Sequence, residues 1–177
     1  MSSIHMPSLS RYTAFHYVAS ISFVIVGCLT FAHGQAKDIH GALMFAAGEG
    51  NSKLVEDFLA SGADVNHRNE YGETPLHVSA IKGDLDTIKA ILAAGAKVNA
   101  QANAGSPIKQ TPLHWMVYPD HKEGVKLLLA AGADPNIQNE DGETPLDMAL
   151  HMGTSYKEMA KILEQAGGKP STKHEEL

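Results

Sequence analysis

Three histidines in the second half of the chain carry side chains that could bind a metal ion. His114, His121 and His151 offer imidazole nitrogens, and Asp120 could add a carboxylate oxygen, which together are ligand types of a zinc site. The seven-residue interval between His114 and His121 matches no metal-binding motif. We therefore predict no metal and no cofactor, and keep a metal-binding protein or a weak enzyme built on these histidines as an alternative.

Neighbouring carboxylates, such as Glu140 with Asp141, could perform acid–base catalysis only in a desolvated cleft that shifts a pKa. The sequence has no glycine-rich phosphate loop after a strand, no Gly-x-Ser-x-Gly turn and no His-Glu-x-x-His pair. The sole cysteine, Cys28, excludes an intrachain disulfide and a cysteine-rich zinc site. We therefore predict no catalytic residue, and no enzyme.

The charge is unevenly distributed. Before position 36 the only charged side chain is Arg11, and after it 13 basic residues stand against 20 acidic ones, a balance of −7. Such a surplus repels phosphate backbones and anionic headgroups. It argues against nucleic-acid binding and favours a partner with a basic surface.

The amino-terminal segment has the composition of an export signal. An apolar stretch covers residues 15–32, follows Arg11, and is followed by Gly34 and Ala36, which suit a signal-peptidase site. We expect a cleaved signal peptide over residues 1–36. Two alternatives use the same residues: an uncleaved membrane anchor, or a lipoprotein acylated at Cys28, because residues 25–28 resemble a lipobox. Only these alternatives place the protein at a membrane.

The carboxyl-terminal residues 169–177 are polar and charged up to Leu177, and we expect a disordered tail. The last four residues, 174–177, resemble endoplasmic-reticulum retention tetrapeptides. The expected location is the periplasm or the exterior if the source is bacterial, and the endoplasmic-reticulum lumen if it is eukaryotic.

Between these ends the sequence repeats itself. Thr-Pro-Leu-His occurs at 74–77 and 111–114 and Thr-Pro-Leu-Asp at 144–147, while Gly-Ala-x-x-Asn occurs at 62–66, 95–99 and 132–136. These phrases resemble the ankyrin-repeat family. The resemblance implies an all-α repeat solenoid of about four helix-turn-helix units with β-hairpin fingers, spanning residues 37–168, with units at about 38–69, 70–102, 103–139 and 140–168.

The repeated phrases also have a local physical meaning. Threonine is a good N-cap and proline suits the first helical turn, so each Thr-Pro begins a helix. The resemblance implies that His77 and His114 hold the same corner by hydrogen bonds, which makes both structural. Asp147 replaces this histidine in the last unit and cannot reproduce the two-sided bonding of an imidazole. We therefore expect a looser last corner.

The units differ in ways that predict their places in the stack. The first lacks Thr-Pro-Leu-His, as expected of an amino-terminal cap, and Glu164 places a charge where earlier units have leucine, as expected of a terminal cap. Four additional residues within 106–110 lengthen the finger between the second and third units, here called the long finger, either as a binding loop or as a neutral insertion. Pro119 should shorten the first helix of the third unit.

The family resemblance implies that partners contact the finger tips and the exposed side of the first helices, which form a concave groove. The matching finger positions are Glu70, Tyr71, Glu73, Ile108, Lys109, Gln110, Glu140, Asp141 and Glu143. The matching helix positions are Ile81, Lys82, Trp115, Tyr118 and His151. Trp115 aligns with Phe45, Val78 and Met148, which favours a core role, with a groove contact as the alternative.

The predicted function is therefore a non-catalytic protein-protein interaction module, an exported adaptor or regulator that binds a protein partner through its fingers and concave groove. The alternative is a structural repeat protein tethered to a membrane through Cys28 or an uncleaved signal segment. Neither reading identifies the partner, because the same repeat fold serves many unrelated targets.

Overall fold

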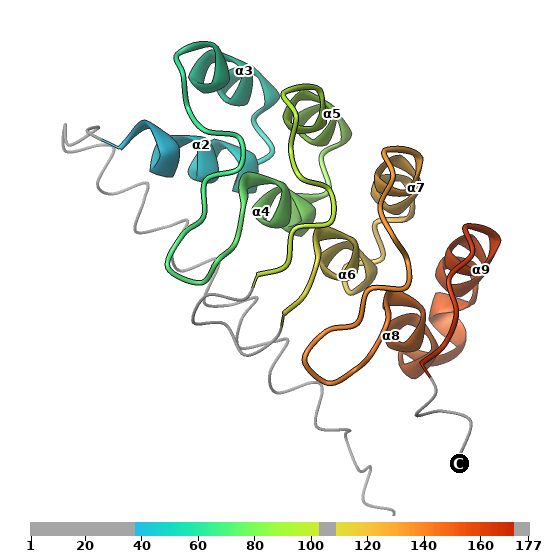
Figure 1. Ribbon diagram of the computed structural model, residues 1–177. Helices are drawn as coiled ribbons and strands as arrows, with labels where there is room; N and C mark the ends of the chain where they lie inside the picture. The colour runs from blue at the N-terminus through green and yellow to red at the C-terminus, as the bar shows by residue number, and fades with distance from the viewer. Residues whose placement is uncertain (1–37, 103–108, 172–177) are drawn as a thin grey trace, which may run out of the picture.

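The computed structural model describes residues 38–102 and 109–171, which form eight α-helices and one 3-10 helix. They are α2 (Ile39–Gly48), α3 (Ser52–Ala60), α4 (Pro75–Lys82), α5 (Leu85–Ala93), α6 (Pro112–Val117), α7 (Lys122–Ala130), α8 (Pro145–His151), η1 (Gly153–Tyr156) and α9 (Lys157–Gln165). Two helices per unit stack in two rows, α2-α4-α6-α8 and α3-α5-α7-α9, with the loops on one side (Figure 1). The all-α repeat solenoid is confirmed.

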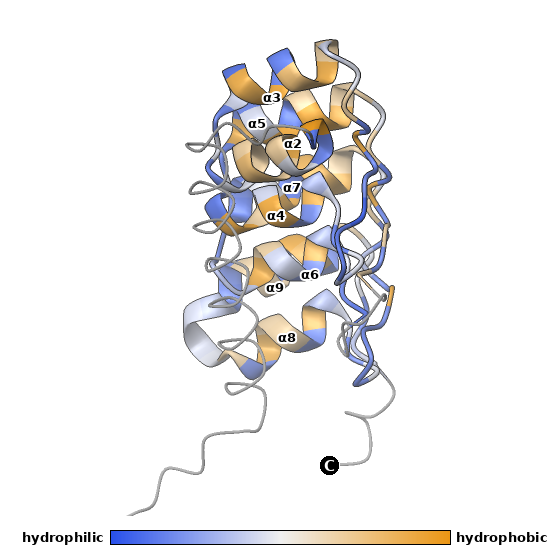
Figure 2. Cartoon of the chain, turned by 90° about the vertical axis from the view of Figure 1, so that its left-hand side faces the viewer, coloured by the Kyte–Doolittle hydropathy of each residue, from blue (hydrophilic) through white to orange (hydrophobic). Residues whose placement is uncertain are grey.

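The core runs along the stack between the two rows. Leu43, Leu76, Leu113 and Leu146, one per unit, are at most 1% exposed, and the second helices add residues such as Ile88. Burying one such side chain contributes roughly 1.5–3 kcal/mol, and each unit buries its apolar face only against its neighbours. Figure 2 shows apolar residues along both rows of helices, whereas much of the loop chain is hydrophilic.

The Thr-Pro helix starts form as the sequence predicts. Thr74 and Thr111 are the N-caps of α4 and α6, with extended backbones. The backbone N–H of Thr74 donates to His77 Nδ1 at 3.1 Å, and His77 Nε2 donates to the carbonyl of Gln110 in the next unit at 3.1 Å. His114 repeats this arrangement, and both imidazoles are fully buried. Their structural role is confirmed.

An asparagine ladder joins consecutive units. Asn66 Nδ2 donates to the carbonyl of Gly95 at 3.2 Å, and Asn66 Oδ1 accepts from the N–H of Lys97 at 2.8 Å. Asn99 and Asn136 make the same pair of bonds to the following unit. Each side chain thus satisfies one backbone donor and one backbone acceptor in the next repeat, which fixes the spacing of the stack.

The first repeat has no preceding asparagine, and His40 in α2 takes that place. Its Nδ1 accepts from the N–H of Asp64 at 3.0 Å, and its ring stacks on His67 with centroids 5.0 Å apart. Asp38 is the N-cap of α2, and its carboxylate accepts from the N–H of His40. The amino-terminal cap therefore closes the ladder with an imidazole nitrogen.

The fingers differ from the expected β-hairpins, since no strand occurs in residues 38–102 or 109–171. In the finger between the first two units, Asn69 Oδ1 accepts from the N–H groups of Tyr71 and Glu73, and the Asn69 N–H donates to the carbonyl of Glu73. The finger before α8 has the same bonds around Asn139. The asparagine side chain thus supplies the acceptor that a neighbouring strand would supply in a β-hairpin. A tight turn results.

The third unit departs from its neighbours where the sequence indicates. Helix α6 ends at Val117, before Pro119, so the predicted shortening is confirmed. Asp120 turns the chain toward α7 with a φ of 59°, where the second unit uses Gly83 at 69°. Asp is among the few residues that tolerate this left-handed conformation.

The last corner is as well bonded as the others, so the expectation that Asp147 loosens it is wrong. Its Oδ2 accepts from the N–H of Thr144 at 2.8 Å, and its two oxygens accept from the N–H of Ser171 at 3.0 and 2.9 Å. In earlier units the histidine donates to a carbonyl of the next finger. At the last corner the backbone of Ser171 presents an N–H instead, and a carboxylate is the matching acceptor.

This contact also alters the expected domain boundary. The repeat domain was expected to end at Gly168, with a disordered tail from 169, yet the Lys169 N–H donates to Asn136 Oδ1 and Ser171 is 4% exposed. Residues 169–171 therefore belong to the ordered stack, because the last rungs of the ladder need them as partners. The rest of the expected tail, 172–177, lies outside the described residues.

We predict that Asp147→Ala lowers the free energy of unfolding by roughly 2–4 kcal/mol, because it leaves the buried N–H groups of Thr144 and Ser171 without an acceptor. Burial would raise the pKa of Asp147, but the hydrogen bonds from Thr144 and Ser171 outweigh it and hold that pKa below its usual value. Urea unfolding monitored by circular dichroism measures the change. Asp134→Ala removes an exposed bond to the Asn136 N–H and is the control; equal losses in both variants would contradict the prediction.

Candidate functional site

The residues that the sequence places at the binding face fall into three groups. Glu73, Gln110 and Glu143 are 3%, 7% and 8% exposed. Tyr71, Ile81, Trp115 and Tyr118 are partly buried, whereas Glu70, Lys82, Lys109, Glu140, Asp141 and His151 are exposed. Ile108 and Cys28 lie outside the described residues. Finger residues and first-helix residues line the same side of the stack.

The expectation that Glu73, Gln110 and Glu143 lie open at the fingers is wrong. Each stands immediately before a Thr-Pro helix start, where the chain enters the stack. The carbonyls of Gln110 and Glu143 accept from His77 and His114 of the preceding unit, at 3.1 and 3.2 Å. These bonds hold the backbone against the neighbouring repeat, and the backbone of Glu73 is held within its own finger by Asn69. The three residues therefore belong first to the scaffold.

The exposed finger tips are acidic. Glu70 lies on the first finger, and Glu140 and Asp141 lie on the last. Lys109, at the base of the long finger, forms an ion pair with Glu140 at 2.9 Å between nitrogen and oxygen, and about half of each side chain remains exposed. An exposed pair of this kind contributes little to stability. The finger tips therefore present exposed acidic side chains, one of which is paired with Lys109.

Two aromatic residues of the third unit, Trp115 and Tyr118, contact the neighbouring units. The ring of Trp115 meets that of His77 edge to face, with centroids 5.7 Å apart, and Trp115 packs against the core. Its Nε1 is buried, and no described residue accepts from it. The Tyr156 hydroxyl donates to the Tyr118 carbonyl at 2.6 Å, which fixes the end of α6 against η1. Trp115 is thus mainly a core residue, and Tyr118 lies at a partly exposed edge.

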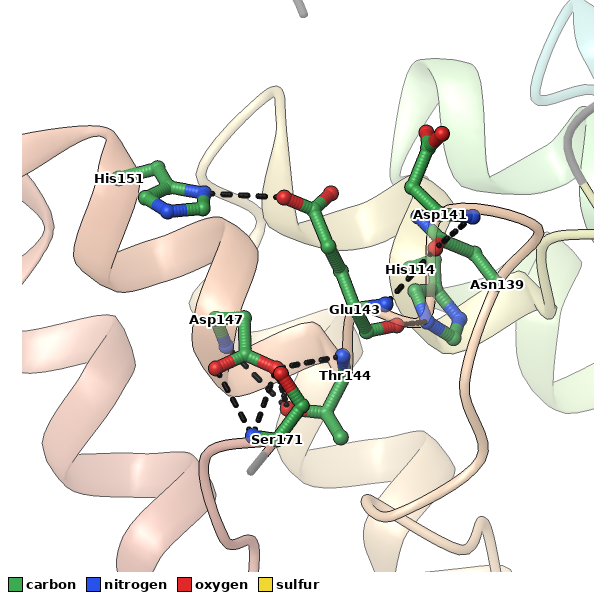
Figure 3. A network of polar contacts seen from close by, with 8 residues as sticks. All are labelled: His114, Asn139, Asp141, Glu143, Thr144, Asp147, His151 and Ser171. Carbon is green, nitrogen blue, oxygen red and sulfur yellow. Dashed lines mark hydrogen bonds and ion pairs between the residues drawn. The ribbon is translucent and has the colours of Figure 1, made fainter. Parts of the chain in front are cut away.

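The structure pairs two predicted site residues that the sequence did not connect. Glu143 Oε1 lies 3.1 Å from His151 Nδ1, and the imidazole, at the end of α8, is one-third exposed (Figure 3). Asn139 fixes the backbone of Glu143 from the other side. The signal that could have revealed this pair is the contrast between His151 and its equivalent Ile81, since a histidine can bond the preceding glutamate and an isoleucine cannot.

The three histidines considered as metal ligands have separate roles. His114 lies in its helix-start corner, His121 Nε2 donates to the carbonyl of Ile81 at 3.1 Å, and His151 contacts Glu143. In residues 38–102 and 109–171 no three His, Cys, Asp or Glu side chains gather in a way that could hold a metal ion.

Within the described ranges, no helix is both long enough and apolar enough to cross a bilayer. The expected signal peptide, with its two alternatives, lies in residues 1–36, outside those ranges. The export prediction therefore stays a prediction.

Comparison with known proteins agrees with the repeat geometry. The family model for ankyrin repeats (three copies) matches residues 15–102, 43–139 and 102–174. Rabankyrin-5 from Mus musculus is 39% identical over 66 residues, 37% of this chain and 6% of the relative. Serine/threonine-protein kinase 12 from Arabidopsis thaliana is 33% identical over 76 residues, 43% of this chain and 17% of the relative.

A third relative, the mitochondrial disaggregase of Bos taurus, is 45% identical over 58 residues, 33% of this chain and 9% of the relative. The chain thus spans less than a fifth of the length of these relatives, so what they share with it is the repeats. Ankyrin repeats are protein-interaction modules and are typically non-catalytic. With the family model matching most of its length and its helices stacked in repeat register, the chain belongs to the ankyrin-repeat family.

Proposed function

We propose that this protein is an exported adaptor or regulator that binds a protein partner through the tips of its fingers and the adjoining side of its first helices. The observation that carries the proposal is the set of exposed carboxylates, Glu70, Glu140 and Asp141, on fingers whose backbones are held by Asn69 and Asn139. Fingers already held in place lose little conformational entropy on binding, which favours affinity.

The charge of the chain supports a basic surface on the partner. The balance of −7 after position 36 adds a long-range attraction to the local carboxylates of the fingers. Export is supported by the apolar segment and small residues of the amino terminus. A regulator of this kind acts by occupying, protecting or bringing together its partners, with no chemical step of its own.

The test removes the charge of the finger tips and keeps their shape. We predict that the triple variant Glu70→Gln, Glu140→Gln, Asp141→Asn captures about one-tenth as much partner as the parent protein, or less, from the exported fraction of the source. The reason is that charge-assisted contacts at the finger tips are lost. Mass spectrometry identifies and quantifies the captured proteins. The melting temperature should hardly change, since these side chains are exposed.

The matched control changes the net charge equally, on the second helices of the first and last repeats. Glu56→Gln, Glu158→Gln and Glu164→Gln alter exposed carboxylates of the second helices and should leave the capture unchanged. Equal losses in both triple variants would mean that the effect comes from net charge alone. Undiminished capture by the finger variant would overturn the proposed binding face. An intact mass that includes acyl chains would instead favour the membrane-tethered alternative.

A further inference from the structure

Two fingers with nearly the same sequence hold the same glutamate in different ways. Residues 69–75 and 139–145 both read Asn-Glu-x-Gly-Glu-Thr-Pro. In the first, Glu73 folds back onto its own finger, and its Oε2 accepts from Asn69 Nδ2 at 2.7 Å. In the second, Glu143 extends away from the finger toward His151, as Figure 3 shows. The difference must come from outside the finger, since the finger residues are alike.

The first helix that follows each finger supplies that difference. Eight residues after Glu73 stands Ile81, and eight residues after Glu143 stands His151. An isoleucine side chain offers no hydrogen bond, whereas the His151 imidazole lies 3.1 Å from Glu143 Oε1. One residue at the exposed end of α8 therefore directs the carboxylate onto the side of the stack that carries the proposed binding face.

The second oxygen of this carboxylate has no hydrogen-bond partner among the described residues. Glu143 Oε2 is buried, no described residue donates to it, and only 10% of the side chain is exposed. An unsatisfied buried acceptor costs about 1–3 kcal/mol, and more when it is charged. An acceptor of this kind on the binding side is suited to recognition, because a ligand that donates to it removes this cost.

The backbone of Glu143 is too tightly held to relieve this cost by moving away. Its N–H donates to Asn139 Oδ1 at 2.9 Å, and its carbonyl accepts from His114 Nε2 at 3.2 Å. The donor must therefore come to the carboxylate. A neighbouring side chain has to turn aside to admit it, and His151, one-third exposed and already in contact with Oε1, lies where it can do so.

We propose that the Glu143 carboxylate is the anchor for one arginine or lysine side chain of the partner protein, which enters beside or in place of the His151 imidazole. A cationic donor fits better than a neutral one, because the exposed Glu140 and Asp141 lie on the same finger. This inference rests on the proposed function and adds to it the chemical group that the groove recognises.

The experiment compares two glutamates that differ only in their surroundings. The probe is an acetylated and amidated pentapeptide, Gly-Arg-Gly-Arg-Gly, titrated into the isotopically labelled full chain at fixed ionic strength and followed by NMR. We expect shifts centred on the His151 imidazole and the Glu143 backbone. Glu143→Gln should raise the Kd by about tenfold or more, whereas Glu73→Gln, which removes the same charge from the equivalent position, should change it less than about twofold.

One further measurement keeps the outcome clear. A pentapeptide with citrulline in place of arginine has a similar shape without the charge, and should produce no shifts at His151 in the parent protein. This comparison needs no variant, so it holds even if Glu143→Gln disturbs folding. Equal weakening by the two glutamate variants, or shifts spread over all fingers, would reduce the binding to general charge attraction and overturn the anchor.

The anchor and the proposed function can fail separately. If the arginine peptide leaves His151 and Glu143 unaffected while the finger-tip variant still loses its captured partner, the anchor is wrong and the binding face remains. If the finger-tip variant keeps its partner while the peptide binds at Glu143, the proposed face is wrong and the carboxylate is a cation site of another kind.

Discussion

Acidification from pH 7 to pH 4.5 is expected to lower the free energy of unfolding by roughly 4–5 kcal/mol, through two buried histidines. Burial lowers the pKa of His77 and of His114 to about 4, from an ordinary value of 6.5. Because the unfolded chain binds these protons more readily than the folded chain, stability is full above pH 6.5 and falls as the pH drops toward 4. Each histidine contributes about 1.4 kcal/mol per pH unit within that window.

The hydrogen bonds explain why protonation cannot be tolerated at these corners. The Thr74 N–H donates to His77 Nδ1, and His77 Nε2 donates to the carbonyl of Gln110. Both nitrogens are thus used by a neutral imidazole, and a proton on Nδ1 would face the Thr74 N–H. Each corner joins two repeats, so its loss would loosen the stack on both sides.

Urea unfolding at half-unit pH steps between 8 and 4.5 measures this dependence. The variant His114→Gln is expected to be less stable at pH 7 and to lose about half of the pH dependence, since one of the two titrating groups is gone. A flat profile in the parent protein between pH 6.5 and 4.5 would contradict the prediction. The lowered pKa of Asp147 acts in the same direction at still lower pH.

Gly83→Ala is expected to lower the free energy of unfolding by roughly 2–4 kcal/mol, from two separate costs. Gly83 has a φ of 69°, which an alanine adopts at a cost of about 1–2 kcal/mol. A Cβ at this position would also lie 2.5 Å from the ring of His121. That ring is held by its bond to the Ile81 carbonyl, so it cannot move without breaking a contact between the second and third units.

Gly95→Ala separates the two costs. Gly95 also has a positive φ, 88°, but apart from its chain neighbours no atom of the described residues lies within 4 Å of the position its Cβ would occupy. We expect this variant to lose only the backbone term, about 1–2 kcal/mol. If urea unfolding gives the same loss in free energy of unfolding for both variants, the contact with His121 does not contribute to the cost at Gly83.

These two predictions concern the contacts on which the proposed binding face depends. Histidine corners and the glycine turn set the position of each first helix relative to the next, and the asparagine ladder sets the spacing of the fingers. A change that loosens these contacts should weaken partner binding in proportion to stability. The finger-tip and Glu143 variants are designed to weaken binding with little loss of stability, which distinguishes recognition from folding.

Much of the fold could be predicted because its determinants are local. Thr-Pro fixes a helix start within a few residues, Pro119 ends α6 early, and the recurring leucines mark the buried face at helical spacing. Repetition of these signals in phase then requires stacking, since no single unit can bury its own apolar residues. The sequence by itself therefore determined the fold class, the number of repeats and the structural role of the histidines.

Tertiary contacts, within and between repeats, decided what the sequence could not. Glu73 and Glu143 have the same local sequence, yet the residue eight positions onward decides that one folds back and the other extends toward the groove. Asp147 was expected to weaken its corner, but the N–H of Ser171, 24 residues later, supplies the donor that it needs. A side chain's available partners depend on which distant backbone groups packing brings beside it, and only the tertiary structure shows these.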